Sequence, residues 1–183
     1  MDTAPLPALD ATLRHALKAR IAGSMPALVR AAVEALNEDE IWRAPREGMN
    51  APGTLVRHCA SALRYFVVAR ITGGSFQRDR DDEFSARPEI TKAELLTDWD
   101  AVVDEVRRTI DALPPDALAG VSVDAERRYS LLGEDLLAAT VHLSVHAGQL
   151  VLLARLYGHG FGDDLWGTVH RASGAMRPPP PTS

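Results

Sequence analysis

Apolar residues recur at every third or fourth position over long stretches of this chain, which is the pattern of amphipathic helices. In the first stretch, for example, Leu28, Ala32 and Leu36 share one face. The pattern predicts long helices at about residues 9–36, 52–72, 91–113 and 134–157. We therefore expect an all-α protein, with one domain in residues 1–158 and a C-terminal arm and proline-rich tail in residues 159–183.

Polar and glycine residues place the ends of these helices. An interruption at residues 23–26 predicts a restarted helix, with Pro26 in its first turn and Ser24 as its cap. Asn50 is expected to cap the second helix, and Thr91 and Glu94 form a capping-box pattern at the start of the third. The sequence also predicts helix ends at Gly73, at Pro114 and at Gly158, and a short extended piece at residues 121–123.

Composition narrows the class of protein. The chain is 46% hydrophobic but only 5% aromatic, so Leu, Val and Ala must fill the core, which favours helices. Its net charge is −5 and no basic stripe stands out, so we expect no nucleic-acid partner. The single Cys excludes an intramolecular disulfide, and the N-terminus does not resemble a secretory signal, so we expect a cytoplasmic protein.

One uncharged stretch, residues 136–154, approaches the length of a membrane span. It also contains Thr140, Ser144, Gln149 and two histidines, and these polar groups are costly in lipid. A helix buried at the centre of a soluble bundle accounts for both its length and its polarity. We therefore predict no membrane association.

The same stretch carries the candidate chemistry. His142 and His146 are four residues apart, so both imidazoles lie on one face of a helix. If His58 projects inward from a neighbouring helix, three nitrogen donors can meet at one divalent metal and leave a coordination position open. The spacing alone leaves two alternatives, a metal site or a pair of packed core histidines.

Local sequence excludes two known kinds of metal centre. Position 143 is Leu, so the His-Glu-x-x-His signature of zinc proteases is absent. Ala139 and Leu143 likewise exclude the Glu-x-x-His pairs of di-iron carboxylate bundles. A mononuclear, nitrogen-rich site remains, and imidazole donors suit zinc, nickel, copper or ferrous iron.

Residues beside these histidines have weaker signals. Gln149 lies near the same helix face and could orient a ligand or hydrogen-bond across helices, and Asp135 could favour the helix N-terminus. Cys59 points about 100° away from His58, so we interpret it as a small buried hydrophobe. His15, His159 and His170 have no helical partner and are expected at the surface.

A charged segment, residues 78–84, joins the second and third predicted helices. Such a run is usually a solvated loop. It could also supply Arg78 or Arg80 to an anionic substrate and Glu83 for proton transfer. The residues alone leave both readings open.

The order of these features resembles a known family. A His follows the stretch from Trp42 to Gly53, an Arg-Asp-Arg-x-x-Glu-Phe loop follows at residues 78–84, and the last long helix carries His142-x-x-x-His146-x-Gly148-Gln149. This order resembles the DinB/YfiT-like superfamily, and within it a branch with that loop. The resemblance covers about residues 9–158, and it implies a four-helix bundle with an unusual crossover order.

The resemblance also implies a site and an activity. By position, the metal ligands would be His58, His142 and His146, holding zinc or nickel. Relatives with known activity use low-molecular-weight thiols, so the first hypothesis is a thiol transferase acting on a small electrophile. Alternatives are a metal-dependent hydrolase and a non-enzymatic, metal-binding helical dimer, and a homodimer is expected in either case. The remaining candidates are Glu83, Tyr65 and Gln149 as catalytic residues and Arg78 and Arg80 as substrate-binding residues.

Overall fold

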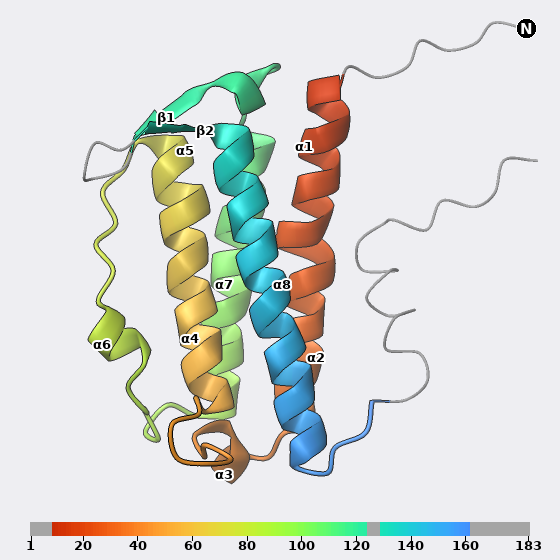
Figure 1. The fold of residues 1–183 in the computed structure, drawn as a ribbon, viewed down its shortest axis with the longest axis vertical. Coiled ribbons are helices and arrows are strands. Elements are labelled where there is room, and N and C mark those ends of the chain that lie inside the picture. The colour runs from red at the N-terminus through yellow and green to blue at the C-terminus, as the bar shows by residue number, and fades with distance from the viewer. Residues whose placement is uncertain (1–8, 124–128, 162–183) are drawn as a thin grey trace, which may run out of the picture.

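Long helical rods make up the body of the molecule (Figure 1). The computed structural model describes residues 9–123 and 129–161. The all-α class predicted from the sequence is confirmed. The rods are α1 (Leu9–Ala19), a π-helical turn (Arg20–Ser24) and α2 (Met25–Ala35); α4 (Pro52–Leu63), a π-helical segment (Arg64–Ala69) and α5 (Arg70–Thr72); α7 (Lys92–Asp111); and α8 (Leu132–Leu156).

Short elements connect the rods. They are α3 (Glu38–Ile41), α6 (Arg80–Glu83), a 3-10 turn (Ala117–Ala119) and the strands β1 (Val121–Val123) and β2 (Tyr129–Leu131). The strands form an antiparallel hairpin in which Val121 pairs with Leu131. The extended piece at residues 121–123 was therefore predicted correctly. Helix α6 was not predicted, because its four residues are too few to show a helical period.

Contacts between rod ends define their directions. Arg14 at the start of the chain's first rod donates to the carbonyl of Leu113, just beyond the end of α7, at 2.6 Å. Lys92 at the start of α7 donates to the carbonyl of Leu36, just beyond α2, at 2.6 Å. The first rod and α7 are therefore antiparallel, whereas α4 and α7 run in the same direction and α8 runs with α1 and α2 (Figure 1).

Because α4 and α7 are parallel, the chain between them must return along the whole bundle. This connection, residues 73–91, passes down the outside of α4 and places α6 beside it (Figure 1). Helix α8 packs between α2 and α4. The groove between α4 and α8 is thus bordered by a long crossover segment, and this arrangement brings residues 78–84 to the predicted histidines.

The boundary signals were partly correct. The capping box of Thr91 and Glu94 is present, and Gly73 ends its helix with a φ of 68° in the left-handed region. Pro26 lies in the first turn of α2, as predicted. Ser24, however, has helical backbone angles and makes no capping hydrogen bond, because a π-helical turn carries the helix through the predicted break. Ala51, not Asn50, is the N-cap residue of α4.

Helix α8 differs from the expected buried central helix. It is long and apolar enough to cross a membrane by length and composition, but it packs against α2 and α4 as a bundle helix. Only 33% of its apolar window is buried. Its inner face carries Leu136, Leu143 and Leu150, while its outer face leaves large apolar side chains exposed. Because the apolar run is continuous, the sequence pattern could not show that one side of the helix is buried and the other exposed.

The packing of the inner face of α8 can be tested at Leu150. We expect Leu150→Ala to lower the free energy of unfolding by about 2–5 kcal/mol, because Leu150 is 0% exposed and its loss leaves a cavity. Leu13→Ala makes the same change at a helical position that is 46% exposed, and should cost less than about 0.5 kcal/mol. Urea unfolding followed by circular dichroism measures both. Equal losses would show that α8 does not pack as described.

Candidate metal centre

Three histidines meet in the groove between α4 and α8. His58 comes from α4, and His142 and His146 come from α8. One nitrogen from each lies within 4.8 Å of the other two, and the ring centroids are 4.5–5.0 Å apart. His58 is buried and the other two are half-buried. The structure therefore brings together the three residues that the sequence and the resemblance proposed as ligands.

A carboxylate fixes the orientation of His58. Its Nδ1 lies 2.9 Å from Oε2 of Glu83, which comes from α6. An ionised carboxylate can only accept, so Nδ1 carries the proton and donates it to Glu83. The lone pair of His58 is then on Nε2, the atom free to bind a metal. A carboxylate behind a histidine in this way also raises the basicity of the ligand nitrogen.

Glu83 is the centre of a buried polar cluster. Burial alone would raise the pKa of its carboxyl, but hydrogen bonds from Arg78, Ser61 and His58 outweigh that effect and hold the pKa at about 2. Arg78 donates from Nε at 2.8 Å and from Nη2 at 2.6 Å, and Ser61 donates its hydroxyl. Glu83 is therefore charged at neutral pH and fully engaged as an acceptor.

The histidines of α8 also present nitrogens toward one another. His146 Nδ1 lies 2.7 Å from Oε1 of Gln149, so the ring donates to the amide oxygen and its Nε2 is left with the lone pair. His142 Nε2 is buried and has no hydrogen-bond partner among the described residues. Burial first, and then the nearby His146 and His58, lower the pKa of His142 to about 4. Each ring can thus present a nitrogen lone pair to a metal.

This donor set fits a metal ion. A buried imidazole nitrogen without a partner is costly, and a divalent cation shared with two other imidazoles would satisfy it. Among the described residues, the cluster contains these three histidines and no Cys or carboxylate at a fourth position. Three nitrogen ligands suit zinc, nickel, copper or ferrous iron, and they leave a position open for a substrate or water.

The two arginines of the charged segment lie differently. Arg78 is half-buried, and its Nε and Nη2 are committed to Glu83. Arg80 is exposed, with its guanidinium 5.3 Å from the ring centroid of Phe84, whose ring lies 4.5 Å from that of His58. Residues 77–81 line an open hollow beside this stack. Arg80 therefore offers a positive charge near the histidines.

Tyr65 lies two turns beyond His58 in the π-helical segment. Its ring packs edge-on against Phe66 at 5.0 Å, and the ring of Phe66 is 6.1 Å from that of His142. A π-helical segment shifts the register of the residues that follow it, so α-helical spacing counted from His58 no longer gives the facing residue. Phe66 was missed for that reason. The catalytic role predicted for Tyr65 stays a prediction.

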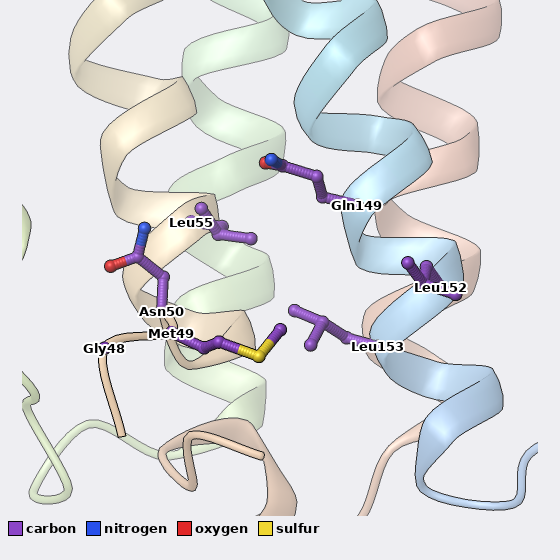
Figure 2. Close-up of a pocket in the computed structure, with 7 residues that line it drawn as sticks. All are labelled: Gly48, Met49, Asn50, Leu55, Gln149, Leu152 and Leu153. Atoms are coloured by element: carbon purple, nitrogen blue, oxygen red, sulfur yellow. The ribbon is translucent and has the colours of Figure 1, made fainter. Parts of the chain in front are cut away.

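An apolar cavity of about 310 Å³ lies between the first turn of α4, with the loop before it, and the second half of α8 (Figure 2). None of its lining side chains is charged; they belong to Met49, Asn50, Leu55, Gln149, Leu152 and Leu153, with the backbone of Gly48. Gln149 joins the cavity to the centre, since the same side chain holds His146. Leu55 lies one turn before His58 on α4. The cavity can thus hold an uncharged group beside Gln149, the residue that links it to His146.

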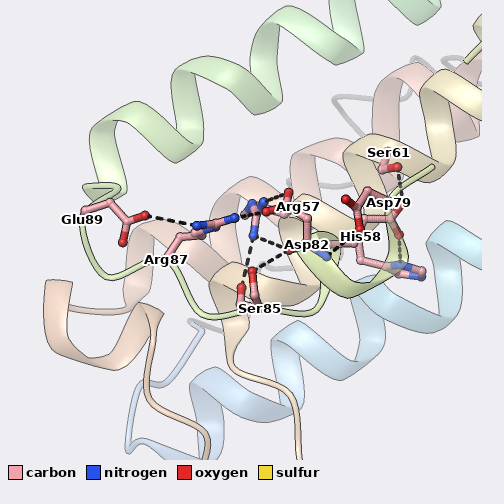
Figure 3. A network of polar contacts seen from close by, with 9 residues as sticks. Arg57, His58, Ser61, Asp79, Asp82, Ser85, Arg87 and Glu89 are labelled. Atoms are coloured by element: carbon pink, nitrogen blue, oxygen red, sulfur yellow. Dashed lines mark hydrogen bonds and ion pairs between the residues drawn. The ribbon is translucent and has the colours of Figure 1, made fainter. Parts of the chain in front are cut away.

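A second network attaches α6 to α4 (Figure 3). Arg57 of α4 donates to the backbone carbonyls of Asp82 and Ser85 at 2.8 and 3.1 Å and pairs with the Asp82 carboxylate. Arg87 pairs with the same carboxylate. This network fixes α6, and with it Glu83. Arg57 was not predicted from the sequence. The signal that could have indicated it is that it directly precedes His58 in the chain.

The remaining candidates have structural environments. Cys59 is buried, and burial raises the pKa of its thiol to about 12, as expected for a small hydrophobe. Asp135 accepts from Ser122 and Ser130 and so ties the hairpin to α8. His159 was expected at the surface, but it is half-buried and its Nε2 contacts Glu40 at 2.6 Å. His15 is exposed as predicted, and His170 lies outside the described residues, as does most of the C-terminal arm.

The fold and the histidine cluster define an all-helical protein with a candidate metal centre in a bundle groove. The chain belongs to the DinB superfamily, whose family model matches residues 24–150. A search among curated proteins gives no significant match. The finer assignment to the branch with the Arg-Asp-Arg-x-x-Glu-Phe loop stays a prediction.

Two solved structures have a similar fold. One is a DinB-like protein from Bacillus cereus ATCC 10987, with a TM-score of 0.60 and 14% identity over 74% of this chain and 87% of that one. The other is a mycothiol-dependent maleylpyruvate isomerase, with a TM-score of 0.58 and 19% identity over 79% of this chain. The match spans only 61% of the isomerase chain. At these identities the likeness establishes the fold alone.

Proposed function

We propose that this protein is a metal-dependent enzyme that transfers a low-molecular-weight thiol to a small electrophile. The observation that carries the proposal is the buried, unpartnered Nε2 of His142 facing two imidazoles whose other nitrogens are held by Glu83 and Gln149. Such a set has three donors and an open position, which is the arrangement of catalytic rather than closed structural sites.

His58, His142 and His146 would hold the ion, with zinc or nickel as the preferred candidates. A bound divalent ion would stabilise a thiolate and so lower the pKa of the thiol at neutral pH. The similarity in fold to a mycothiol-dependent isomerase supports a thiol, rather than water, as the nucleophile. In the transfer, the sulfur would bond to the electrophilic carbon, and the leaving group would depart with its bonding electrons.

The side chains around the histidines would have separate roles. Glu83 would orient His58 rather than exchange protons, because its pKa of about 2 keeps it charged and three residues already donate to it. Exposed Arg80 would attract an anionic group of the thiol. The uncharged cavity beside Gln149 would hold the apolar part of the electrophile. Small-molecule substrates of this kind fit an enzyme of the cytoplasm.

The proposal predicts turnover with a chromogenic electrophile. Protein reconstituted with zinc or nickel should accelerate the reaction of glutathione with 1-chloro-2,4-dinitrobenzene, measured by absorbance, and a chelator should remove this activity. Arg80→Ala should raise the KM for anionic glutathione by about 10-fold and leave it nearly unchanged for the uncharged thiol 2-mercaptoethanol. Arg87→Ala is the matched control, because Arg87 pairs with Asp82 away from the histidines.

Two outcomes would count against this function. Metal-dependent hydrolysis of esters without any thiol transfer would favour water as the nucleophile and a hydrolase. Stoichiometric metal without turnover across a broad panel of thiols and electrophiles would favour a non-enzymatic metal-binding protein.

A further inference from the structure

The outer face of α8 carries an unusual row of apolar side chains. Five large residues on this helix are between 55% and 59% exposed: Leu137, Val141, Val145, Leu152 and Leu156. Their three- and four-residue spacing, completed by Gly148, places them along one side of the helix. At 1.5 Å per residue the row is about 28 Å long. It is therefore a continuous apolar surface, not a set of isolated surface hydrophobics.

Gly148 lies within this row and packs against no side chain of the described residues. A Cβ added to it would meet no atom within 4 Å, and its φ is not in the left-handed region. Glycine in the interior of a helix costs about 1 kcal/mol relative to alanine. No contact among the described residues offsets this cost, and the property that glycine offers is close approach by another backbone.

The charges on this face are self-complementary. Between Glu134 and Arg155 the only charged residue of α8 is Asp135, which is buried and accepts hydrogen bonds from Ser122 and Ser130. Glu134 and Arg155 are both exposed, on the same side as the apolar row. Arg155 has no ion-pair partner among the described residues. If a second α8 lay antiparallel across the first, Glu134 of each copy would face Arg155 of the partner subunit. A parallel pair would instead place like charges together, which is unfavourable.

We propose that α8 pairs antiparallel with α8 of a second copy of this chain, about a two-fold axis near Ser144 and Val145. In this register Leu137 faces Leu152 of the partner subunit, and Val141 faces Gly148 of the partner subunit. The glycine thus lies where the two helices approach most closely. An isologous contact of this kind is the commonest way in which two identical chains assemble.

The size of the face sets the strength of the dimer. The five exposed side chains offer roughly 500 Å² of apolar surface per copy, or roughly 1,000 Å² in the pair, at the lower limit of specific interfaces. A dissociation constant in the range of about 1–100 μM is therefore expected. A lipid surface is a poorer occupant, because membrane-surface helices carry rows of Lys and Arg, and Arg155 is the only cation of α8.

The dimer leaves the histidines outside the paired faces, although Leu152 lies in the interface and also lines the apolar cavity, so the partner helix would border that cavity. His142 and His146 lie about 100° and 140° around the helix from Val141, on the side that faces α4. The inference therefore does not rest on the proposed enzymatic function, and either can fail without the other.

Sedimentation equilibrium of the full chain tests the proposal, from about 1 to about 200 μM. Wild type should convert from monomer to dimer over this range, and Val141→Glu should weaken the dimer at least about 100-fold by placing a charge against the partner helix. Ala101→Glu adds the same charge to the exposed face of α7 and should leave the dimer unchanged. Circular dichroism shows whether each variant is folded.

A second pair of variants tests the register. Arg155→Glu should weaken the dimer about 10-fold, because it would then face Glu134. Adding Glu134→Gln should recover most of that loss while keeping the helix cap, since Gln also serves in capping boxes. No recovery would overturn the antiparallel register. A wild-type monomer at the highest concentration would overturn the dimer, as would an assembly that resists Val141→Glu and is lost when residues 162–183 are removed.

Discussion

His142→Ala is expected to abolish metal binding and to leave the fold intact. Wild type reconstituted with zinc or nickel and then desalted should retain about one ion per chain, and the variant about none. Changes to residues that only orient a ligand already cost about 10–100-fold in metal affinity, so loss of one ligand in three should cost more. Because His142 Nε2 has no hydrogen-bond partner among the described residues, its removal leaves no polar group unpaired there.

Inductively coupled plasma mass spectrometry on untagged protein measures the metal, and circular dichroism measures the fold. His15→Ala and His159→Ala are matched controls: His15 is exposed and His159 contacts Glu40, and neither belongs to the cluster. Both should retain the full metal content. Wild type without metal after reconstitution, or His142→Ala with undiminished metal, would make the histidines a packed core cluster and leave a non-enzymatic helical protein as the better interpretation.

The helices and two of the three proposed metal ligands, His142 and His146, could be predicted from the sequence. A 3.6-residue period located the rods, and the capping box of Thr91 and Glu94 located the start of α7 to the residue. The spacing of His142 and His146 is a local property of one helix, so it could be read directly. His58 is 84 residues away from His142, and only the resemblance to a family linked the two.

The residues that the sequence could not place depend on long-range geometry. Glu83 lies beside His58 only because α4 and α7 are parallel, which forces the chain between them to return along α4. Nothing in a charged run of residues says which of its carboxylates will be buried. The π-helical segment that places the ring of Phe66 6.1 Å from that of His142 has no recognisable pattern of its own.

The exposed face of α8 was hidden for a different reason. Periodicity distinguishes an apolar side from a polar side, but α8 is apolar on both sides, so the pattern could not show which residues face the core. The structure separates Leu143 and Leu150, which are buried, from Val141 and Leu152, which are exposed. An uncharged helix therefore serves two purposes: one side builds the core and the other is available for an interface.

Glu83 couples the crossover segment to the metal centre, because it is the acceptor for His58 and for Arg78. Glu83→Gln preserves the shape of the side chain but removes its charge, and it replaces one acceptor oxygen with a donor amide. Either the His58 ring or the Ser61 hydroxyl would then face an amide N–H, and the positive charge of Arg78 would be left uncompensated near the ligands. Both effects disfavour binding of a cation.

We therefore expect Glu83→Gln to weaken metal binding by about 10–100-fold, measured by competition with a chromophoric chelator. Asp82→Asn is the matched control: the adjacent carboxylate pairs with Arg57 and Arg87 rather than with the histidines, so metal affinity should change by less than about threefold. If both variants weakened binding equally, the effect would come from the position of α6. If neither did, His58 would need no orienting carboxylate, and the role proposed for Glu83 would be wrong.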